Sequence, residues 1–290
     1  MLPTMKIFVV WVACWGWCAS GVVADTLACF NTPFGQMQVG LYDTARPVTT
    51  RNFIRYVQSG SYSNMFLHRC IPGFVVQGGG FTVADPTSYS VFTTYWGVKD
   101  FGKITNEFGV GPLLSNTYGT LAMAKVGTDP NSATSQWFFN LTNNSANLDH
   151  QNGGFTVFGR VLSGAHVLEA FNTLAYGGGI VDLRRMYGTN ASTSLFSDLP
   201  VKYWGLTPPN YRDFMFTDIT LMTTEVGIVG GHSEITWNSA SNKVNTVEFA
   251  TNTPPSWQVL KSVTGTGAAM SVTDSAPISG YRVYRVRVNF

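Results

Sequence analysis

Among the 290 residues of this chain, an arginine inside an apolar stretch is the clearest candidate for a catalytic or binding role. Residues 66–81 read FLHRCIPGFVVQGGGF, so Arg69 is followed by a Pro-Gly turn, an apolar pair, Gln77 and three glycines. The guanidinium group of arginine stays charged and donates hydrogen bonds in a planar fork. The pattern therefore offers a permanent donor close to apolar and amide side chains.

A second set of short motifs follows in residues 119–125 (GTLAMAK), 131–139 (NSATSQWFF), 148–150 (LDH) and 155–161 (FTVFGRV). Taken singly, Arg69 reads as a surface ion-pair partner, and Phe74 or Phe138 as plain core. Taken together, these residues favour a binding site. The four histidines are far apart and lack ligand-like spacing to cysteines or carboxylates, so we expect no metal site.

Elements that position these motifs are visible in the hydrophobic pattern. Residues 47–57 and 165–172 are expected to be helices, the first with Pro47 near its start. Short apolar runs predict strands over residues 36–42, 74–77, 120–124, 137–141 and 155–161. Two helices among many short strands indicate a closed or nearly closed sheet with helical caps. Residues 82–103 and 176–210 are expected to be loop elaborations.

Beyond residue 226 the composition changes to serine, threonine, asparagine and valine with period-two segments. We expect a small, all-β module there, loosely similar to fibronectin-III-like sandwiches. Trp237, Trp257 and Tyr284 are its expected core aromatics, and a sugar-binding platform is the alternative interpretation.

Composition narrows the possible functions of the whole chain. It is 44% hydrophobic and 12% charged, which favours a globular protein with a sizeable core over a disordered chain or a coiled coil. Eighteen Lys and Arg residues against sixteen Asp and Glu give a net charge of +2, without a basic cluster. We therefore expect no nucleic-acid partner.

The first 24 residues have the composition of a secretory signal. Lys6 is the only charged residue before Asp25, an apolar run follows it, and the segment ends in small residues at Ala24. We expect cleavage after Ala24, no integral membrane span afterwards, and a periplasmic or extracellular location. A membrane anchor and a lipoprotein signal ending at Cys14 are the alternatives.

Cleavage would leave Cys29 and Cys70 as the remaining cysteines. An export compartment permits one disulfide between them, but both lie in apolar runs where a buried thiol is an equally good interpretation. The choice stays open.

Together, the two sets of motifs resemble the cyclophilin family of peptidyl-prolyl cis-trans isomerases, and they recur in family order over residues 26–224. The exported bacterial branch is the most similar, on the evidence of residues 77–81, 122–125 and 132–136. The resemblance implies a mainly β fold: an eight-stranded antiparallel barrel capped by two helices, followed by the small β module. We expect a signal peptide over 1–24, an isomerase domain over 25–225 and the β module over 226–290.

The resemblance also implies a site, in which Arg69 takes the catalytic position and no cofactor is needed. Phe74, Val75, Phe138 and Leu148 take the proline pocket, with Phe155 at its edge, and Gln77, Ala124, Lys125 and Gln136 take the positions that bind the peptide backbone. By their own sequence context, Lys125 reads as a solvated loop charge, and His68 and His150 as structural residues.

Three positions depart from the family pattern. Val75 stands where methionine is common, and Phe155 where histidine or tyrosine is usual. Asn147 stands where many eukaryotic members carry a tryptophan associated with tight cyclosporin binding, so we expect weak or no binding of that inhibitor.

The leading hypothesis is an exported isomerase that acts on prolines in unfolded or newly translocated polypeptides. A non-catalytic peptide-binding or chaperone module, attached to a surface or partner by the β module, is the alternative. A pure binder has no need of Arg69, which favours the isomerase. A carbohydrate-associated surface protein is the third possibility.

Overall fold

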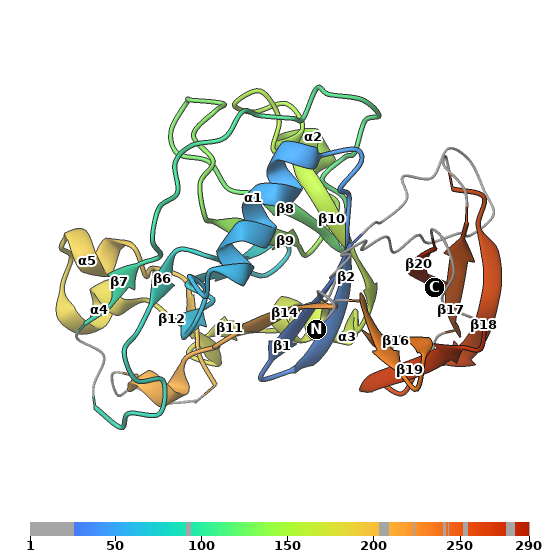
Figure 1. Cartoon of the computed structure of the whole chain (residues 1–290). Coiled ribbons are helices and arrows are strands. Elements are labelled where there is room, and N and C mark those ends of the chain that lie inside the picture. Colours follow the sequence, from blue (N-terminus) through green and yellow to red (C-terminus); the bar gives the residue numbers. More distant parts are fainter. Residues whose placement is uncertain are drawn as a thin grey trace. The chain divides into compact units, whose positions relative to one another are not determined.

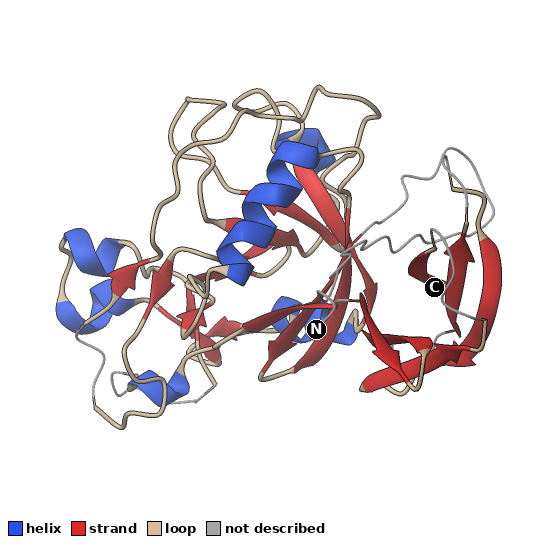
Figure 2. Cartoon of the chain, in the orientation of Figure 1, coloured by secondary structure: helices blue, strands red, loops and turns tan. Residues whose placement is uncertain are grey.

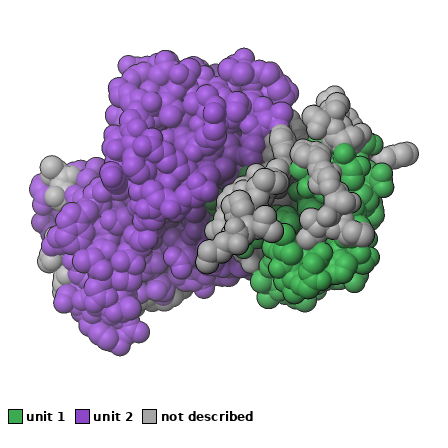
Figure 3. Space-filling view, viewed as in Figure 1, with its two compact units in different colours: residues 1–27, 221–290 green, residues 28–220 purple. Residues whose placement is uncertain are grey.

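The computed structural model describes residues 26–90, 94–202, 209–222, 224–239, 242, 244–251, 255–276 and 282–289. The predicted signal segment lies outside these residues. The chain divides into two compact units, coloured in Figure 3: Ala28–Thr220, and Leu221–Phe290 together with residues up to Leu27. This division lies slightly before the domain boundary expected after residue 225.

The larger unit is built on one eight-stranded sheet (Figures 1 and 2). Neighbouring strands from β2 through β10, β8, β9 and β5 to β4 pair antiparallel. The segments that precede the two edge strands pair with each other, because Phe66 forms an antiparallel bridge with Phe216 and the Leu67 amide donates to the Met215 carbonyl at 2.9 Å. The predicted eight-stranded barrel is thereby confirmed. Its strands, in spatial order, are β14 (Asp218–Met222), β1 (Thr26–Thr32), β2 (Gly35–Leu41), β10 (Val157–Ser163), β8 (Thr120–Met123), β9 (Trp137–Asn140), β5 (Val75–Gly78) and β4 (Arg69–Ile71).

Aromatic side chains fill the inside of this barrel. Phe30 of β1 contacts Trp137 and Phe139 of β9 edge-on, with ring centroids 5.3 and 5.1 Å apart. Phe53 stacks on Phe30 from the helix α1 (Pro47–Gln58), which confirms the first predicted helix. The second predicted helix is α3 (His166–Asn172), whose buried face is made of Val167, Leu168 and Phe171. Shorter helices are α2 (Ser145–Leu148), α4 (Leu183–Tyr187), α5 (Ala191–Ser194) and the 3₁₀ turn η1 (Tyr211–Asp213).

The two expected loop elaborations are more ordered than predicted. They contain short elements that share a second hydrophobic core, here called the side core, made of Phe66, Val83, Val181, Leu183, Phe196, Leu199, Val201 and Phe214. The expectation of a loop was wrong for much of residues 176–210, where short helices and strands form, whereas the described part of residues 82–103 is mainly loop with the two-residue strand Trp96–Gly97. The apolar residues of the side core are spaced too irregularly to form a periodic pattern, yet the tertiary fold gathers them. The additional strands are β3 (Met65–Phe66), β6 (Phe81–Thr82), β7 (Trp96–Gly97), β11 (Ala175–Tyr176), β12 (Gly179–Val181) and β13 (Leu199–Pro200).

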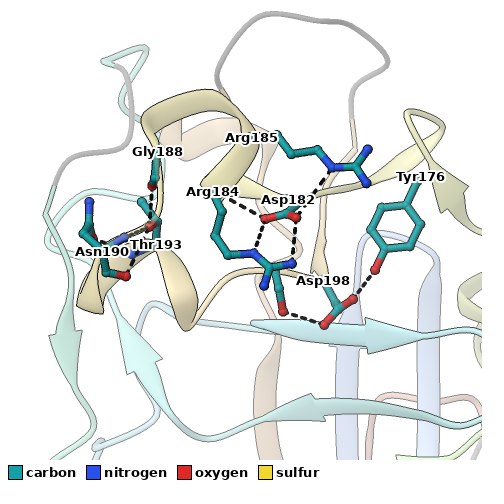
Figure 4. A network of polar contacts seen from close by, with 9 residues as sticks. Tyr176, Asp182, Arg184, Arg185, Gly188, Asn190, Thr193 and Asp198 are labelled. Atoms are coloured by element: carbon teal, nitrogen blue, oxygen red, sulfur yellow. Dashed lines mark hydrogen bonds and ion pairs between the residues drawn. The ribbon is translucent and has the colours of Figure 1, made fainter.

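Hydrogen bonds and ion pairs connect the short helices and strands of residues 176–198, which contribute to the side core (Figure 4). The Asp182 carboxylate starts α4, because it accepts the Arg184 amide at 3.0 Å and the Arg184 guanidinium at 2.8 Å. Asp198 accepts hydrogen bonds from the Tyr176 hydroxyl and, at 2.7 Å, from Ser197. The Asp198 carbonyl in turn accepts the Cys70 amide of β4 at 2.8 Å. The network therefore ties this region to the strand that carries Arg69.

The smaller unit contains two three-stranded antiparallel sheets, as predicted for the β module. Trp237 and Tyr284 are buried in its core, as expected, and each makes a hydrogen bond between the two sheets: Trp237 donates to Asn245, and Tyr284 to Asp274. Trp257 is not a core residue; it is half-buried beneath the guanidinium of Arg285 at 4.2 Å. One sheet has the order β15 (Thr224–Val229), β16 (His232–Asn238), β19 (Ala269–Asp274), and the other β18 (Gln258–Thr264), β17 (Val244–Ala250), β20 (Val283–Asn289).

Cys29 and Cys70 are both free and buried. Burial raises the pKa of the Cys29 thiol to about 11 and that of Cys70 to about 12. The structure therefore has Cys29 and Cys70 as buried thiols and not as a disulfide.

The start of helix α1 depends on a carboxylate supplied from a distant loop. Glu107 is 4% exposed and accepts hydrogen bonds from the Val48 amide and from the amide and hydroxyl of Thr49, at 2.7–3.1 Å. A negative charge at this position is favourable because the first amides of a helix lack intrahelical partners. Next to it, the fully buried Arg46 donates to the carbonyls of Val110 and Pro112. Glu107 therefore fixes α1 on the barrel.

Replacing Glu107 with glutamine is expected to destabilise the protein. The neutral amide keeps the shape, but its NH2 group cannot accept a hydrogen bond, so at least one of the three bonds is lost and the others lose the assistance of the charge. The free energy of unfolding is therefore expected to fall by about 1–3 kcal/mol in urea titration. Glu169→Gln is the matched control, since Glu169 is exposed and a glutamine can still accept its bond from Tyr118. Equal stability of the two variants would contradict the role given to Glu107.

Candidate active site

Strand register places the predicted site residues in one row across the barrel. Arg69 of β4 pairs with Gln77 of β5, Gln77 pairs with Phe138 of β9, and Phe138 pairs with Ala122 of β8. Directly paired residues have their Cβ atoms about 4.5–5.5 Å apart on the same face of a sheet. Three neighbouring strands therefore present an arginine, a glutamine and a phenylalanine side by side, and β8 adds an alanine.

Side-chain alternation explains why this row lies on the outer face. Trp137 and Phe139 pack with Phe30 inside the barrel, so Gln136 and Phe138, at alternate positions along β9, have to face outward. By the same alternation along β5, Val75 and Gln77 face outward and Val76 faces the interior of the barrel. Ala124 follows β8 on the outward parity, and its amide donates to the Gln136 carbonyl at 2.9 Å.

The two glutamines are locked to each other. Gln77 Nε2 donates to Gln136 Oε1 at 2.7 Å. Burial and the neighbouring Arg69 charge lower the pKa of His68 to about 3, so the imidazole is neutral at physiological pH. The unfolded chain binds a proton at His68 near pH 6.5, and this histidine therefore disfavours the folded state increasingly as pH falls below that value.

The apolar end of the site comes from Leu148 and Phe155 next to Phe138, while Phe74 lies beside Arg69. Leu148 of α2 is 5% exposed, and its carbonyl accepts the Phe155 amide at 2.9 Å. The Phe155 ring then meets Phe138 edge-on, with ring centroids 5.9 Å apart. Phe74 lies in the turn before β5, where its ring centroid is 5.9 Å from the guanidinium carbon of Arg69. This arrangement places a guanidinium at one end and an apolar cluster at the other.

Buried polar side chains hold the Phe74 turn. The Phe74 carbonyl accepts the Leu141 amide at 2.8 Å and the Asn144 side-chain amide at 2.9 Å. Asn144 also donates to Asn140, which is fully buried. Asn144 was not predictable as a support of the site, because an asparagine in a loop carries no pattern that reveals a buried partner.

Lys125 differs from its expected role as a solvated loop charge. Its Nζ donates to the carbonyls of Asn152 and Gly154, both at 2.6 Å, and lies 4.6 Å from the centroid of the Phe155 ring. Burial lowers the pKa of Lys125 to about 8, against the opposing effect of the Asp129 charge. The lysine is therefore a fixed part of the site.

The glycines after Gln77 are explained by close packing. A Cβ on Gly79 would lie 2.4 Å from the Ser135 carbonyl oxygen, and the backbone there has φ +78°. A Cβ on Gly80 would lie 2.9 Å from His68 Cε1 and 3.2 Å from Gln136 Cδ. Gly79 therefore makes room for the backbone of Ser135, and Gly80 for the side chains of His68 and Gln136.

All ten predicted site residues thus contribute to one surface region of the larger unit. Arg69, Val75, Gln77, Gln136, Phe138 and Ala124 come from the strands of the row or their ends, and Phe74, Leu148, Phe155 and Lys125 from the flanking loops. Within the described residues, no group of three or more His, Cys, Asp or Glu side chains is arranged to hold a metal ion. No helix in that same part of the chain is long and apolar enough to cross a membrane.

A closed antiparallel barrel with an arginine beside an apolar cluster on its outer face defines a protein of the cyclophilin class. Residues 27–186 match the family described as cyclophilin type peptidyl-prolyl cis-trans isomerase/CLD, which is more than half of the chain. The chain belongs to this family.

Relatives in bacteria carry the same family name. The peptidyl-prolyl cis-trans isomerase of Acinetobacter baylyi is 37% identical over 148 residues, 51% of this chain and 72% of that protein. Peptidyl-prolyl cis-trans isomerase B of Escherichia coli is 36% identical over 152 residues, 51% of this chain and 85% of that protein.

Among solved structures, the chain is similar to a cyclophilin type peptidyl-prolyl cis-trans isomerase of Cryptosporidium parvum, crystallised in the presence of the dipeptide Ala-Pro. The match covers 67% of this chain and 98% of that chain, with 22% sequence identity and a TM-score of 0.43.

Gly80→Ala is expected to disturb the pair of glutamines. The new methyl group meets His68 and Gln136, so the side-chain amide resonances of Gln77 and Gln136 shift in a ¹⁵N-correlated NMR spectrum. The matched control is Gly97→Ala, because a Cβ at Gly97 meets nothing within 4 Å. Unchanged glutamine resonances in a folded Gly80→Ala protein would contradict the proposed packing.

Proposed function

We infer that this chain accelerates cis-trans rotation about the peptide bond before proline. Family membership and the names of the bacterial relatives support this activity. The observation that carries the assignment of residues is the row Arg69, Gln77, Phe138 at directly paired positions. We propose Arg69 as the catalytic residue and the other nine residues of the site as the groups that bind the peptide.

The reaction requires no covalent step. Rotation about an X-Pro bond is slow because the twisted bond loses amide resonance, at a barrier of about 20 kcal/mol. In the twisted state the proline nitrogen regains a lone pair that accepts a hydrogen bond. A guanidinium fixed beside that nitrogen stabilises the twisted state more than either planar state, which is the condition for catalysis.

The remaining residues hold one side of the bond still. Phe138 and Leu148, with Val75, Phe74 and the edge residue Phe155, form an apolar slot for the proline ring. Gln77, Gln136, Ala124 and Lys125 supply polar groups for the flanking peptide. When both sides are held in defined orientations, less conformational freedom has to be lost in reaching the twisted state.

We propose that the substrates are proline-containing segments of unfolded or newly exported polypeptides. The signal-like composition of residues 1–24 supports export to the periplasm or the exterior. We expect the reaction to use side chains and backbone groups of the protein, without a cofactor.

Arg69→Ala is expected to lower kcat/KM by about 100- to 1000-fold, the effect of removing one donor to a developing charge. Exchange NMR on a capped Ala-Pro peptide measures the rate without a coupled protease, and urea titration verifies folding. Arg160→Ala is the matched control, since Arg160 is exposed on β10, outside the proposed site. A parent protein that binds the peptide without accelerating rotation would favour the non-catalytic binding module, and a fully active Arg69→Ala variant would remove Arg69 from catalysis.

Weak cyclosporin binding is a second expectation, because Asn147 is an exposed polar residue that bonds to Gln151 where many relatives carry an aromatic ring. Asn147→Trp is expected to tighten binding by at least about tenfold, the change that burial of a large aromatic surface readily supplies. Isothermal titration gives the Kd. Ala146→Trp places the same ring at the adjacent exposed position of α2, and equal tightening by both variants would argue against a specific role of position 147.

A further inference from the structure

The ammonium group of Lys125 is held at a single position beside the proposed proline slot. Its hydrogen bonds to the Asn152 and Gly154 carbonyls use two of the three N–H groups of an ammonium. The two backbone acceptors and the face of the Phe155 ring hold the ammonium in one position, whereas a lysine surrounded by solvent would be free to move. The third N–H remains for an acceptor on a ligand.

This ammonium lies one aromatic ring away from the slot. Phe155, over which Lys125 lies, packs against Phe138, and its amide bonds to the carbonyl of Leu148. A peptide seated with its proline on Phe138 and Leu148 therefore brings its neighbouring residues close to Lys125. Each residue of an extended chain adds at most about 3.3–3.6 Å. One or two residues, together with the length of an acidic side chain, therefore reach from a proline in the slot to the Lys125 ammonium.

The charge of Lys125 is not matched by a bonded carboxylate among the described residues. Asp129 is the acidic group that acts on it, and Asp129 is itself held by the Lys103 ammonium at 2.9 Å and by the Asn131 amide at 2.9 Å. The bonded partners of Lys125 are neutral carbonyls, although burial disfavours its charged form. A carboxylate on the ligand would supply the missing counter-charge.

We propose that Lys125 determines substrate specificity by selecting prolines that have an aspartate or glutamate within two residues. The inference rests on the proposed function, because the proline slot is what brings the acidic side chain to Lys125. Recognition here consists of one charge-assisted hydrogen bond at a half-buried site, beside the edge that departs from the family pattern at Phe155. The expected preference over a neutral isostere is roughly three- to tenfold, between the effects of an exposed and a buried charge pair.

Pairs of capped peptides that differ only in glutamate or glutamine test the proposal. One pair carries the variable residue immediately before proline and the other immediately after it. For each peptide, NMR titration gives the Kd and exchange spectroscopy gives kcat/KM. The parent protein is expected to prefer glutamate in at least one pair by the stated factor, and Lys125→Met is expected to bring that ratio close to one.

Lys103→Met is the matched control, because Lys103 is exposed and also interacts with Asp129. It is expected to retain the preference for glutamate, and an equal loss in both variants would show a general charge effect and overturn the proposal. Turnover of the glutamine peptides without any preference would likewise overturn it while leaving the isomerase function intact. If the peptides bind without turnover, the isomerase function fails and the Kd ratios still decide the role of Lys125. Absence of binding by all four peptides would overturn the proposal.

Discussion

Aromatic packing inside the barrel is the constraint on which the rest of the structure depends. Phe30, Phe53, Trp137 and Phe139 can share one interior only if β9 and its neighbours are paired in a single register. A shift by one residue would turn Trp137 and Phe139 outward and bring Gln136 and Phe138 into the core. The same contacts that stabilise the barrel therefore place Gln77 and Phe138 beside Arg69 on its outer face.

Rigid support distinguishes this outer row from a set of ordinary surface side chains. Gln77 and Gln136 are bonded to each other, the Phe74 turn is held by Asn144, and β4 is bonded along its outer edge to Asp198. A catalyst of bond rotation gains from such fixed groups, because they are oriented before the substrate arrives. The buried His68 is neutral and therefore introduces no competing charge near Arg69.

Short apolar runs and two helical segments made a nearly closed sheet with helical caps predictable from the sequence. The barrel and the site residues Arg69, Gln77 and Phe138 were implied by the resemblance of their distinctive motifs to the cyclophilin family, whereas the strand register that pairs these residues comes from the structure. The side core was not predictable, because Val83, Phe196 and Phe214 are far apart in the chain and lack a common period. The resemblance implied a place for Lys125 in the site, but its own sequence context did not, because its partners are backbone carbonyls of residues 152 and 154, which no side-chain pattern reveals.

We propose that the proline ring binds between Phe138 and Leu148 with the Arg69 guanidinium beside its nitrogen. Intermolecular nuclear Overhauser effects between a ¹³C-labelled Ala-Pro peptide and the full chain test this placement directly. We expect contacts from the proline ring protons to Phe138 and Leu148, and a shift of the Arg69 Nε resonance on titration. Saturating peptide that contacts a different surface and leaves the Arg69 resonance unmoved would contradict it.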